Sequence, residues 1–388
     1  MVSVNLILRD NLITKAQGAK EEYELAAQKE SNNLDEFETA LNDVFSTGNT
    51  ENSTSSEEKW GYIDADGIML FYIGKSENYK FTNDTVKAKK YEYNLETENY
   101  EETEEYTDIN ISECRSVFMY DPLTITGPKN LDFNGISLEN TENIEVGPFV
   151  ETVKGLEGFA EIPNGFCQDA ENLKEVILNT NIKSIGEFAF SNCTNLTKID
   201  LPNSIESIDN NAFEYCSKLE KIILPNTLKQ ISAGTFQYCD SLTNVEIPNT
   251  VTEIGGSAFR DCYALTNMSI PEGVKFISEG LFLNCYNLEK VHMPDTVTVI
   301  KYYAFTGCTK LKDINISNNT KSIGEYVFRD CTSLEKLDLP ASLEGMWTDS
   351  LLNCTSLTDI TIRKEKDSLS LTNTGLTSEQ INNIKWKP

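Results

Sequence analysis

The residues that could do chemistry in this chain are ten cysteines and a single histidine, His292. Eight of the cysteines recur at intervals of 23 residues, at Cys193, Cys216, Cys239, Cys262, Cys285, Cys308, Cys331 and Cys354. Such regular spacing indicates one repeated unit rather than a disulfide framework. The chain has no Cys-x-x-Cys pair, and a zinc site needs ligands that converge at short spacings. We therefore expect no metal and no cofactor.

The chemical state of these cysteines has three interpretations. Stacked units would place neighbouring cysteines about 5 Å apart, which a disulfide can bridge. A free cysteine is also a small buried side chain with a weak S–H donor, which suits a tight turn. We favour buried free thiols, with occasional bridges or a redox or metal role as the alternatives.

Charge and motif content argue against several classes of function. The chain has 61 acidic and 33 basic residues, a net charge of −28, which disfavours binding to nucleic acid and to anionic lipid. It contains neither a nucleophile–base pair in a recognisable context nor a glycine-rich phosphate loop. We therefore predict that the protein is not an enzyme, and an active site in residues 59–159 is the least favoured hypothesis.

The elements that position the cysteines follow from the repeat. Each unit has the pattern C-x-x-L-x-x-I-x-I-P-x-x-V-x-x-I-x-x-x-A-F, and its leucine recurs nine times from Leu173 to Leu357. Alternation at Ile199, Asp200 and Leu201 predicts a short strand, and Pro202 ends it because proline donates no ladder hydrogen bond. A recurring phenylalanine, such as Phe213, fills the interior.

A unit this small cannot bury its apolar face alone, so the units must stack as a solenoid. We expect the strands to form one parallel sheet on the concave side, while the second half of each unit returns the chain. The predicted fold class is α/β: a right-handed superhelical leucine-rich-repeat solenoid, preceded by an N-terminal helix and a small β-rich module.

The repeated phrase L-x-x-I-x-I-P-x-x-V-x-x-I-x-x-x-A-F-x-x-C resembles the BspA-type leucine-rich repeats of bacterial surface proteins, over residues 160–362. This resemblance implies an extracellular or cell-surface location. It does not identify a ligand, because the repeated letters specify packing only.

The segments outside the array suggest a second resemblance. Residues 1–45 have helical spacing, and NLILRDNLITKAQGAKEEYELA resembles the segment after the membrane helix of type IV pilin-like proteins of Gram-positive bacteria. That resemblance implies a native chain tethered to the membrane by a preceding apolar helix that is missing here. Without that helix we expect a monomer.

The remaining segments complete the predicted domain organisation. Residues 46–58 are a predicted linker, and residues 59–159 a small β-rich module that caps the first repeat. Its acidic, tyrosine-rich stretch at 91–108 is interpreted as a solvated loop or an edge strand, with a patch that binds a cation or a partner as the alternative. Residues 363–388 form a C-terminal cap, in which Thr377 or Ser378 starts a short helix that ends near Trp386.

Two groups of exposed side chains are candidate binding residues. The first is an aromatic rim beside the cysteines, formed by Tyr215, Tyr238, Tyr263 and Tyr286. The second is polar, lies on the concave sheet and includes Lys221, Glu246, Lys290 and His292. The alternatives are that the tyrosines only cover the turn and that His292 is an ordinary surface residue.

These residues favour a non-catalytic recognition or adhesion protein that binds a protein or glycan on a host or bacterial surface through the array. The alternative is a structural, pilin-like subunit of a surface appendage that displays the repeats.

Overall fold

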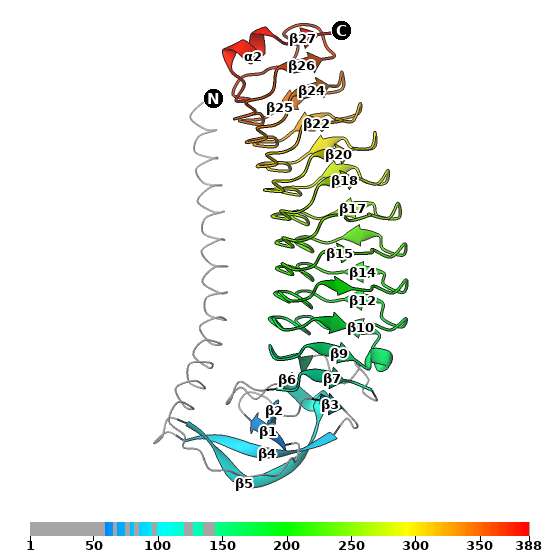
Figure 1. The fold of residues 1–388 in the computed structure, drawn as a ribbon, viewed down its shortest axis with the longest axis vertical. Helices are drawn as coiled ribbons and strands as arrows, with labels where there is room; N and C mark the ends of the chain where they lie inside the picture. Colours follow the sequence, from blue (N-terminus) through cyan, green and yellow to red (C-terminus); the bar gives the residue numbers. More distant parts are fainter. Residues whose placement is uncertain are drawn as a thin grey trace, which may run out of the picture.

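The computed structural model describes residues 59–64, 68–73, 78–80, 85–94, 99–119, 127–134 and 144–387. From residue 144 onward the chain forms a long solenoid of stacked units (Figure 1). The N-terminal helix and linker predicted for residues 1–58 lie outside the described residues and stay predictions.

The first face of the solenoid carries the strands predicted from the isoleucine alternation. They pair in parallel with partners 23 residues apart, such as Lys198 with Lys221 and Asn267 with Lys290. Isoleucine or another apolar residue points inward from each strand, and the residue before it is exposed. These strands are β11 (Glu175–Val176), β13 (Lys198–Ile199), β15 (Lys221–Ile222), β18 (Asn267–Ser269), β20 (Lys290–His292), β22 (Asp313–Ile314), β24 (Lys336–Leu339) and β26 (Asp359–Ile362).

A second parallel ladder occupies the return half of each unit, so the prediction of a single sheet is wrong. Pairs such as Ser184 with Ser207 and Phe276 with Val299 are again 23 residues apart. Two-residue strands leave almost no alternation in the sequence, which explains the missed sheet. The strands are β10 (Glu161–Ile162), β12 (Ser184–Ile185), β14 (Ser207–Ile208), β16 (Gln230–Ile231), β17 (Glu253–Ile254), β19 (Phe276–Ile277), β21 (Val299–Ile300), β23 (Ser322–Ile323) and β25 (Gly345–Met346).

Serine hydroxyls link the rungs where this second ladder is interrupted, between β14 and β16 and between β17 and β19. At most rungs the backbone N–H after the strand donates to the preceding rung, as Gly255 does to the Ile231 carbonyl at 2.7 Å. At the two interruptions, Ser232 Oγ donates to the Ile208 carbonyl at 2.7 Å and Ser278 Oγ to the Ile254 carbonyl.

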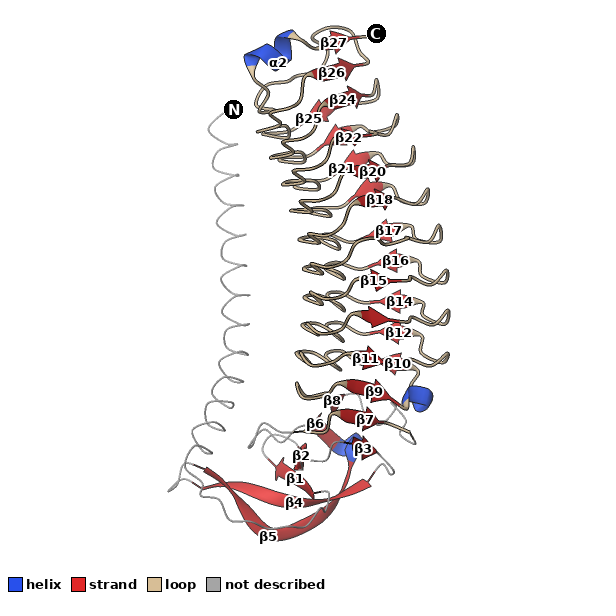
Figure 2. Ribbon diagram, viewed as in Figure 1, coloured by secondary structure: helices blue, strands red, loops and turns tan. Residues whose placement is uncertain are grey.

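The third face is built from turns, and it has its own ladder of hydrogen bonds along the solenoid axis. The N–H groups of Asn211, Phe213 and Tyr215 each donate at 2.9 Å to carbonyls of the next unit. The residue before each cysteine has a left-handed backbone, with φ between 56° and 74° from Asn192 to Asn353. Figure 2 shows these long turns alternating with the short strands of the two sheets.

The interior is filled by stacked phenylalanines and by the cysteines. Neighbouring phenylalanine rings from Phe190 to Phe328 lie with their centroids 5.4–5.8 Å apart, nearly parallel. All the array cysteines are buried, as predicted, and the structure has them as free thiols. Each thiol from Cys193 to Cys354 donates to a carbonyl of the preceding unit, as Cys216 Sγ does to the Phe190 carbonyl at 3.1 Å.

The N-terminal part is a six-stranded sheet in the order β5-β4-β1-β2-β6-β8. Its outermost strand β5 contains most of the acidic, tyrosine-rich stretch, which is therefore an edge strand rather than a loop. The strands are β1 (Lys59–Asp64), β2 (Ile68–Ile73), β4 (Thr85–Asn94), β5 (Asn99–Asn110), β6 (Cys114–Phe118) and β8 (Ile144–Glu145).

The first sheet of the array continues across residue 159 into this N-terminal part. Strand β11 pairs with β9 (Thr152–Lys154), β9 with β7 (Asn130–Asp132) and β7 with β3 (Asn78–Lys80), all in parallel. Buried residues from Trp60 to Leu369 also form one continuous apolar cluster. The two parts therefore share a core.

The C-terminal end closes the array with α2 (Ser378–Asn382) and β27 (Lys385–Trp386). Thr377 caps α2 in a capping box with Gln380, as predicted. The helix ends at Asn382 rather than near Trp386, because Lys385 and Trp386 pair in parallel with β26. Among the described residues α2 is the one α-helix, so this part of the protein is a β-solenoid and not an α/β fold.

Candidate functional site

The four rim tyrosines form two stacked pairs on the turn face. The rings of Tyr215 and Tyr238 lie 4.3 Å apart with an angle of 7° between their planes. Those of Tyr263 and Tyr286 lie 5.2 Å apart at 4°. Tyr215 and Tyr286, at the outer ends, are 45% and 43% exposed. The tyrosines thus cover the turn and also present a large aromatic edge to solvent.

Arg260 and Asp261 lie between the two pairs. The Arg260 guanidinium lies over the Tyr238 ring at 5.8 Å from its centroid, and its Nε donates to Asp261 Oδ2 at 2.9 Å. Asp261 is buried, and its Oδ1 accepts from the Tyr263 hydroxyl at 3.4 Å. Burial and the Asp261 carboxylate raise the pKa of Tyr263 to about 12, so this phenol stays protonated. An ion pair therefore connects the two stacked pairs.

The same face carries aromatic residues that the sequence analysis missed. Tyr303 and Tyr326 stack at 5.0 Å, Tyr302 packs edge-on against Tyr303 at 5.8 Å, and Arg329 lies over Tyr326 at 5.6 Å. Tyr302 is 52% exposed. Tyr303 and Tyr326 each precede the core phenylalanine of their unit by two residues, and this shared position in the repeat could have identified them from the sequence as neighbours.

Together the six stacked tyrosines form what we call the tyrosine ridge: Tyr215, Tyr238, Tyr263, Tyr286, Tyr303 and Tyr326. One of them lies in each of six successive turns, within five residues of a cysteine from Cys216 to Cys331. Arg260 lies one unit beyond Tyr238 and covers the ring of that tyrosine. Arg329 lies in the same unit as Tyr326 and covers its ring. The ridge is thus a row of aromatic edges, hydroxyls and guanidinium groups.

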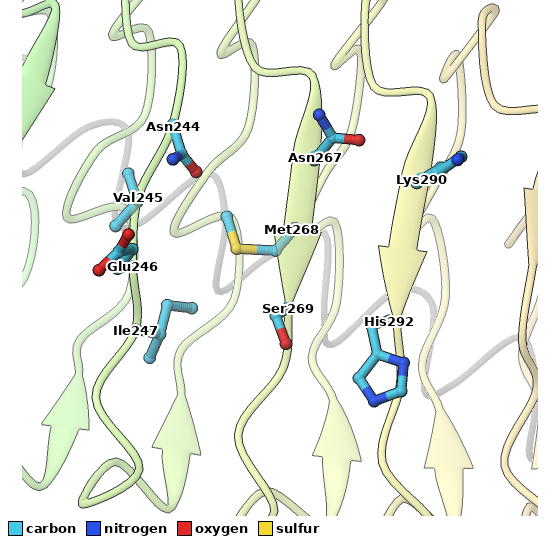
Figure 3. A pocket seen from close by; sticks show the side chains of 9 residues that line it. All are labelled: Asn244, Val245, Glu246, Ile247, Asn267, Met268, Ser269, Lys290 and His292. Atoms are coloured by element: carbon cyan, nitrogen blue, oxygen red, sulfur yellow. The ribbon is translucent and has the colours of Figure 1, made fainter.

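The polar residues predicted on the first sheet surround a shallow hollow of about 470 Å³. Glu246, Lys290 and His292 line it, whereas Lys221 lies on the neighbouring strand β15 and is not among the lining residues. In Figure 3 the lining side chains come from three successive rungs: Glu246 lies on the first, Met268 on the second, and Lys290 and His292 on the third. The hollow coincides with an interruption of the first sheet, since Asn244 makes only an isolated bridge to Lys221. Its lining includes no aromatic anchor.

The described residues that could do chemistry are carboxylates, the imidazole of His292 and the thiols. Within the described ranges, no group of three or more His, Cys, Asp or Glu side chains could hold a metal ion. Burial raises the pKa of the Cys216 thiol to about 12, which suppresses the thiolate that reacts. In the part of the chain that the structure describes, no helix is long and apolar enough to span a bilayer.

Comparison with known families identifies the repeat. Residues 160–289 and 275–385 match the family model of the BspA type leucine rich repeat region, in six copies. No curated protein has significant sequence similarity to the chain.

Solved structures of leucine-rich repeat proteins are similar to the chain. A leucine-rich repeat protein from Bacteroides ovatus is 19% identical, with a TM-score of 0.45, over 87% of this chain and 100% of its own. A leucine rich cell surface protein from Faecalibacterium prausnitzii is 20% identical, with a TM-score of 0.39, over 88% and 96%. The leucine rich repeat protein of T. pallidum is 24% identical, with a TM-score of 0.36, over 68% and 92%.

Proposed function

Because the chain belongs to the BspA-type leucine-rich repeat family, we propose that it is a non-catalytic, cell-surface recognition protein that binds a macromolecular partner through its array. The tyrosine ridge carries this proposal. Tyrosine and arginine dominate the binding energy of many protein interfaces, because each combines a large contact area with a polar end.

The packing within the ridge favours a protein partner over a glycan. A sugar that stacks on tyrosine needs an open ring face, but each ring of a stacked pair covers one face of its neighbour. Arg260 lies over Tyr238 and Arg329 over Tyr326, which leaves little open face on these rings. Ring edges, hydroxyls and guanidinium groups remain, and these suit the mixed apolar and polar surface of a protein.

The cell-surface location rests on the bacterial surface proteins in which BspA-type repeats occur. The alternative function, a pilin-like structural subunit, depends on residues 1–45 and on a membrane helix before them. Residues 1–45 lie outside the described residues, so this alternative and the predicted membrane tether stay predictions.

The proposal predicts that the Tyr238→Ala/Tyr263→Ala double variant loses binding. It removes one ring from each of two stacked pairs, and truncation of an interface hot-spot residue costs about 2 kcal/mol or more of binding energy. Binding to whole cells and to extracellular-matrix protein and glycan arrays would be measured with purified protein. We expect signal on protein targets for the parent chain, and at least about a tenfold loss for the variant.

A matched control is Ile223→Ala/Phe276→Ala, which removes two apolar side chains that are 61% and 48% exposed on the two sheets. This control should bind like the parent. Circular dichroism should show that both variants keep the native fold. Equal binding by parent and ridge variant would rule out the ridge as the recognition surface.

A further inference from the structure

The free edge of β5 is a second surface that the proposed function does not use. Strand β5 is the last strand of its sheet and pairs antiparallel with β4 on one side. On the other side, no strand among the described residues pairs with it. An exposed strand edge presents unpaired N–H and C=O groups, which are a template for another strand. The register with β4 shifts at Thr103–Glu105, opposite Lys90, so the regular part of this edge is residues 106–109, about 14 Å long.

The side chains along this edge are acidic, with one aromatic residue among them. Glu104, Glu105 and Asp108 are exposed, and Tyr106 is 55% exposed. The Glu105 side chain lies 3.5 Å from Lys90 Nζ, whereas the side chains of Glu104 and Asp108 form neither a hydrogen bond nor a salt bridge within the part of the chain described here.

The neighbouring strand shows which chemistry this edge accepts. Lys87 and Lys89 of β4 lie over the Tyr106 ring at 5.6 and 5.5 Å from its centroid, and Lys89 forms a 2.6 Å ion pair with Glu102. A lysine-bearing strand thus already pairs with β5 on its inner side. Tyr106 and Asp108 lie directly opposite Lys89 and Lys87 and so share one face of the strand, and Glu104 lies in the adjoining bulge.

We propose that residues 106–109, with the bulge at Thr103–Glu105 beside them, bind an extended, cationic segment of a partner protein by adding it to the sheet as a further strand. Main-chain hydrogen bonds would supply affinity, lysine or arginine at alternate positions would face Tyr106 and Asp108, and the charge of Glu104 would add to the attraction. A second copy of this chain fits poorly, because two β5 edges would bring like charges into register. The acidic edge therefore selects against self-pairing and for a basic partner.

The test uses the intact chain and a fluorescent nine-residue peptide of alternating threonine and lysine. We expect binding at about 50 mM salt that weakens at about 300 mM, since the contacts are charged and exposed. Hydrogen–deuterium exchange should show new protection in β5. A peptide with glutamate in place of lysine, and a lysine peptide N-methylated at alternate residues, should bind at least about tenfold more weakly.

The protein variant is Glu104→Lys/Asp108→Lys, which should bind the lysine peptide at least about tenfold more weakly and the glutamate peptide more tightly. Its control, Glu157→Lys/Glu171→Lys, makes the same change in net charge at exposed positions outside β5 and should leave binding within about twofold. Equal binding of the N-methylated peptide, protection outside β5, or no binding at low salt would overturn the proposal. The peptide comparison decides the question even where the variant fails to fold.

Discussion

At the scale of the residue, the repeated cysteine is a hydrogen-bond donor as well as a filler of the turn. Cys239 Sγ donates to the Phe213 carbonyl at 3.2 Å, and that carbonyl also accepts from the Cys216 N–H at 3.2 Å. Sequence reasoning could predict a buried thiol from the regular spacing. It could not find the acceptor, which lies 26 residues earlier and comes close only once two units have stacked.

The same limit applies to the tyrosines. The pattern beside the cysteines predicts Tyr215, Tyr238, Tyr263 and Tyr286 as neighbours, and their pairing is observed. The bridging role of Arg260 and Asp261 depends on side-chain geometry across two units, which repeat spacing does not contain.

Burial of the thiols predicts that they are inert in the native protein. Iodoacetamide at about pH 8 should leave the array cysteines unmodified, because the thiolate is the reactive form and burial raises the pKa of Cys216 and Cys354 to about 12. Peptide mass spectrometry would measure the modification of each cysteine. Complete labelling after denaturation is the control, and rapid labelling of native Cys216 would contradict the prediction.

At the scale of the element, the array is built from strands too short to be stable or recognisable alone. The spacing of the leucines and isoleucines predicts where the strands of the first ladder lie, because each unit supplies three residues that alternate between the interior and the surface. In each unit the second ladder uses only two residues, and the turn ladder uses the N–H groups of alternate residues. Only stacking turns such segments into hydrogen-bonded ladders, so local sequence patterns do not predict them.

The C-terminal element shows how the last rung is finished. Gln380 of α2 accepts from the Thr377 N–H at 2.9 Å, and its Nε2 donates at 3.0 Å to the carbonyls of Cys354 and Leu357. The capping sequence predicts the first contact. The other two join α2 to the final unit, where the Cys354 carbonyl also accepts from the Leu357 N–H at 3.2 Å.

Replacement of Gln380 should therefore loosen the last unit. Gln380→Ala should reduce the free energy of unfolding by about 1–2 kcal/mol, because it removes the Gln380 half of the capping box and both side-chain hydrogen bonds to the final unit. Gln380→Glu keeps an acceptor for Thr377 but loses both donors, so it should fall between parent and alanine variant. Urea denaturation gives the energies, and faster hydrogen exchange should appear at residues 354–362. Unchanged exchange there in Gln380→Ala would show that α2 does not cap the array.

At the scale of the whole molecule, one core extends from Trp60 to Leu369. The repeat phrase predicts a solenoid of stacked parallel strands, because its period and apolar columns allow few other structures. It does not predict how the ladder continues through β9, β7 and β3, since those strands lack the repeat phrase. The repeat phrase also does not predict where a ligand binds, because the core positions repeat while the surface positions vary from unit to unit.

The buried thiols acting together should make the array sensitive to alkali. An unfolded thiol ionises near pH 9, whereas burial holds that of Cys216 protonated to about pH 12. The contribution of the neutral thiols to the free energy of unfolding is fully present below pH 9 and is lost as the pH rises toward 12. The free energy of unfolding falls by about 1.4 kcal/mol per pH unit for each thiol in this window. Circular dichroism should show cooperative unfolding in this window.

The ultraviolet absorbance of thiolate separates this mechanism from general alkaline damage. It should rise in one step together with unfolding, since the thiols ionise only when the array opens. Absorbance that rises near pH 9 while the circular dichroism stays native would contradict the prediction. Return to neutral pH under reducing conditions should restore the native spectrum.

The hydrogen bonds that join successive units run along the solenoid, as the three donated by Asn211, Phe213 and Tyr215 illustrate. A pull on the two ends would load these rungs in series, so that the weakest rung opens first and its neighbours follow. Each opened unit releases 23 residues, or about 75 Å of chain. A protein that holds two surfaces together could in this way lengthen by regular steps under tension instead of detaching, and regain its length when the load falls.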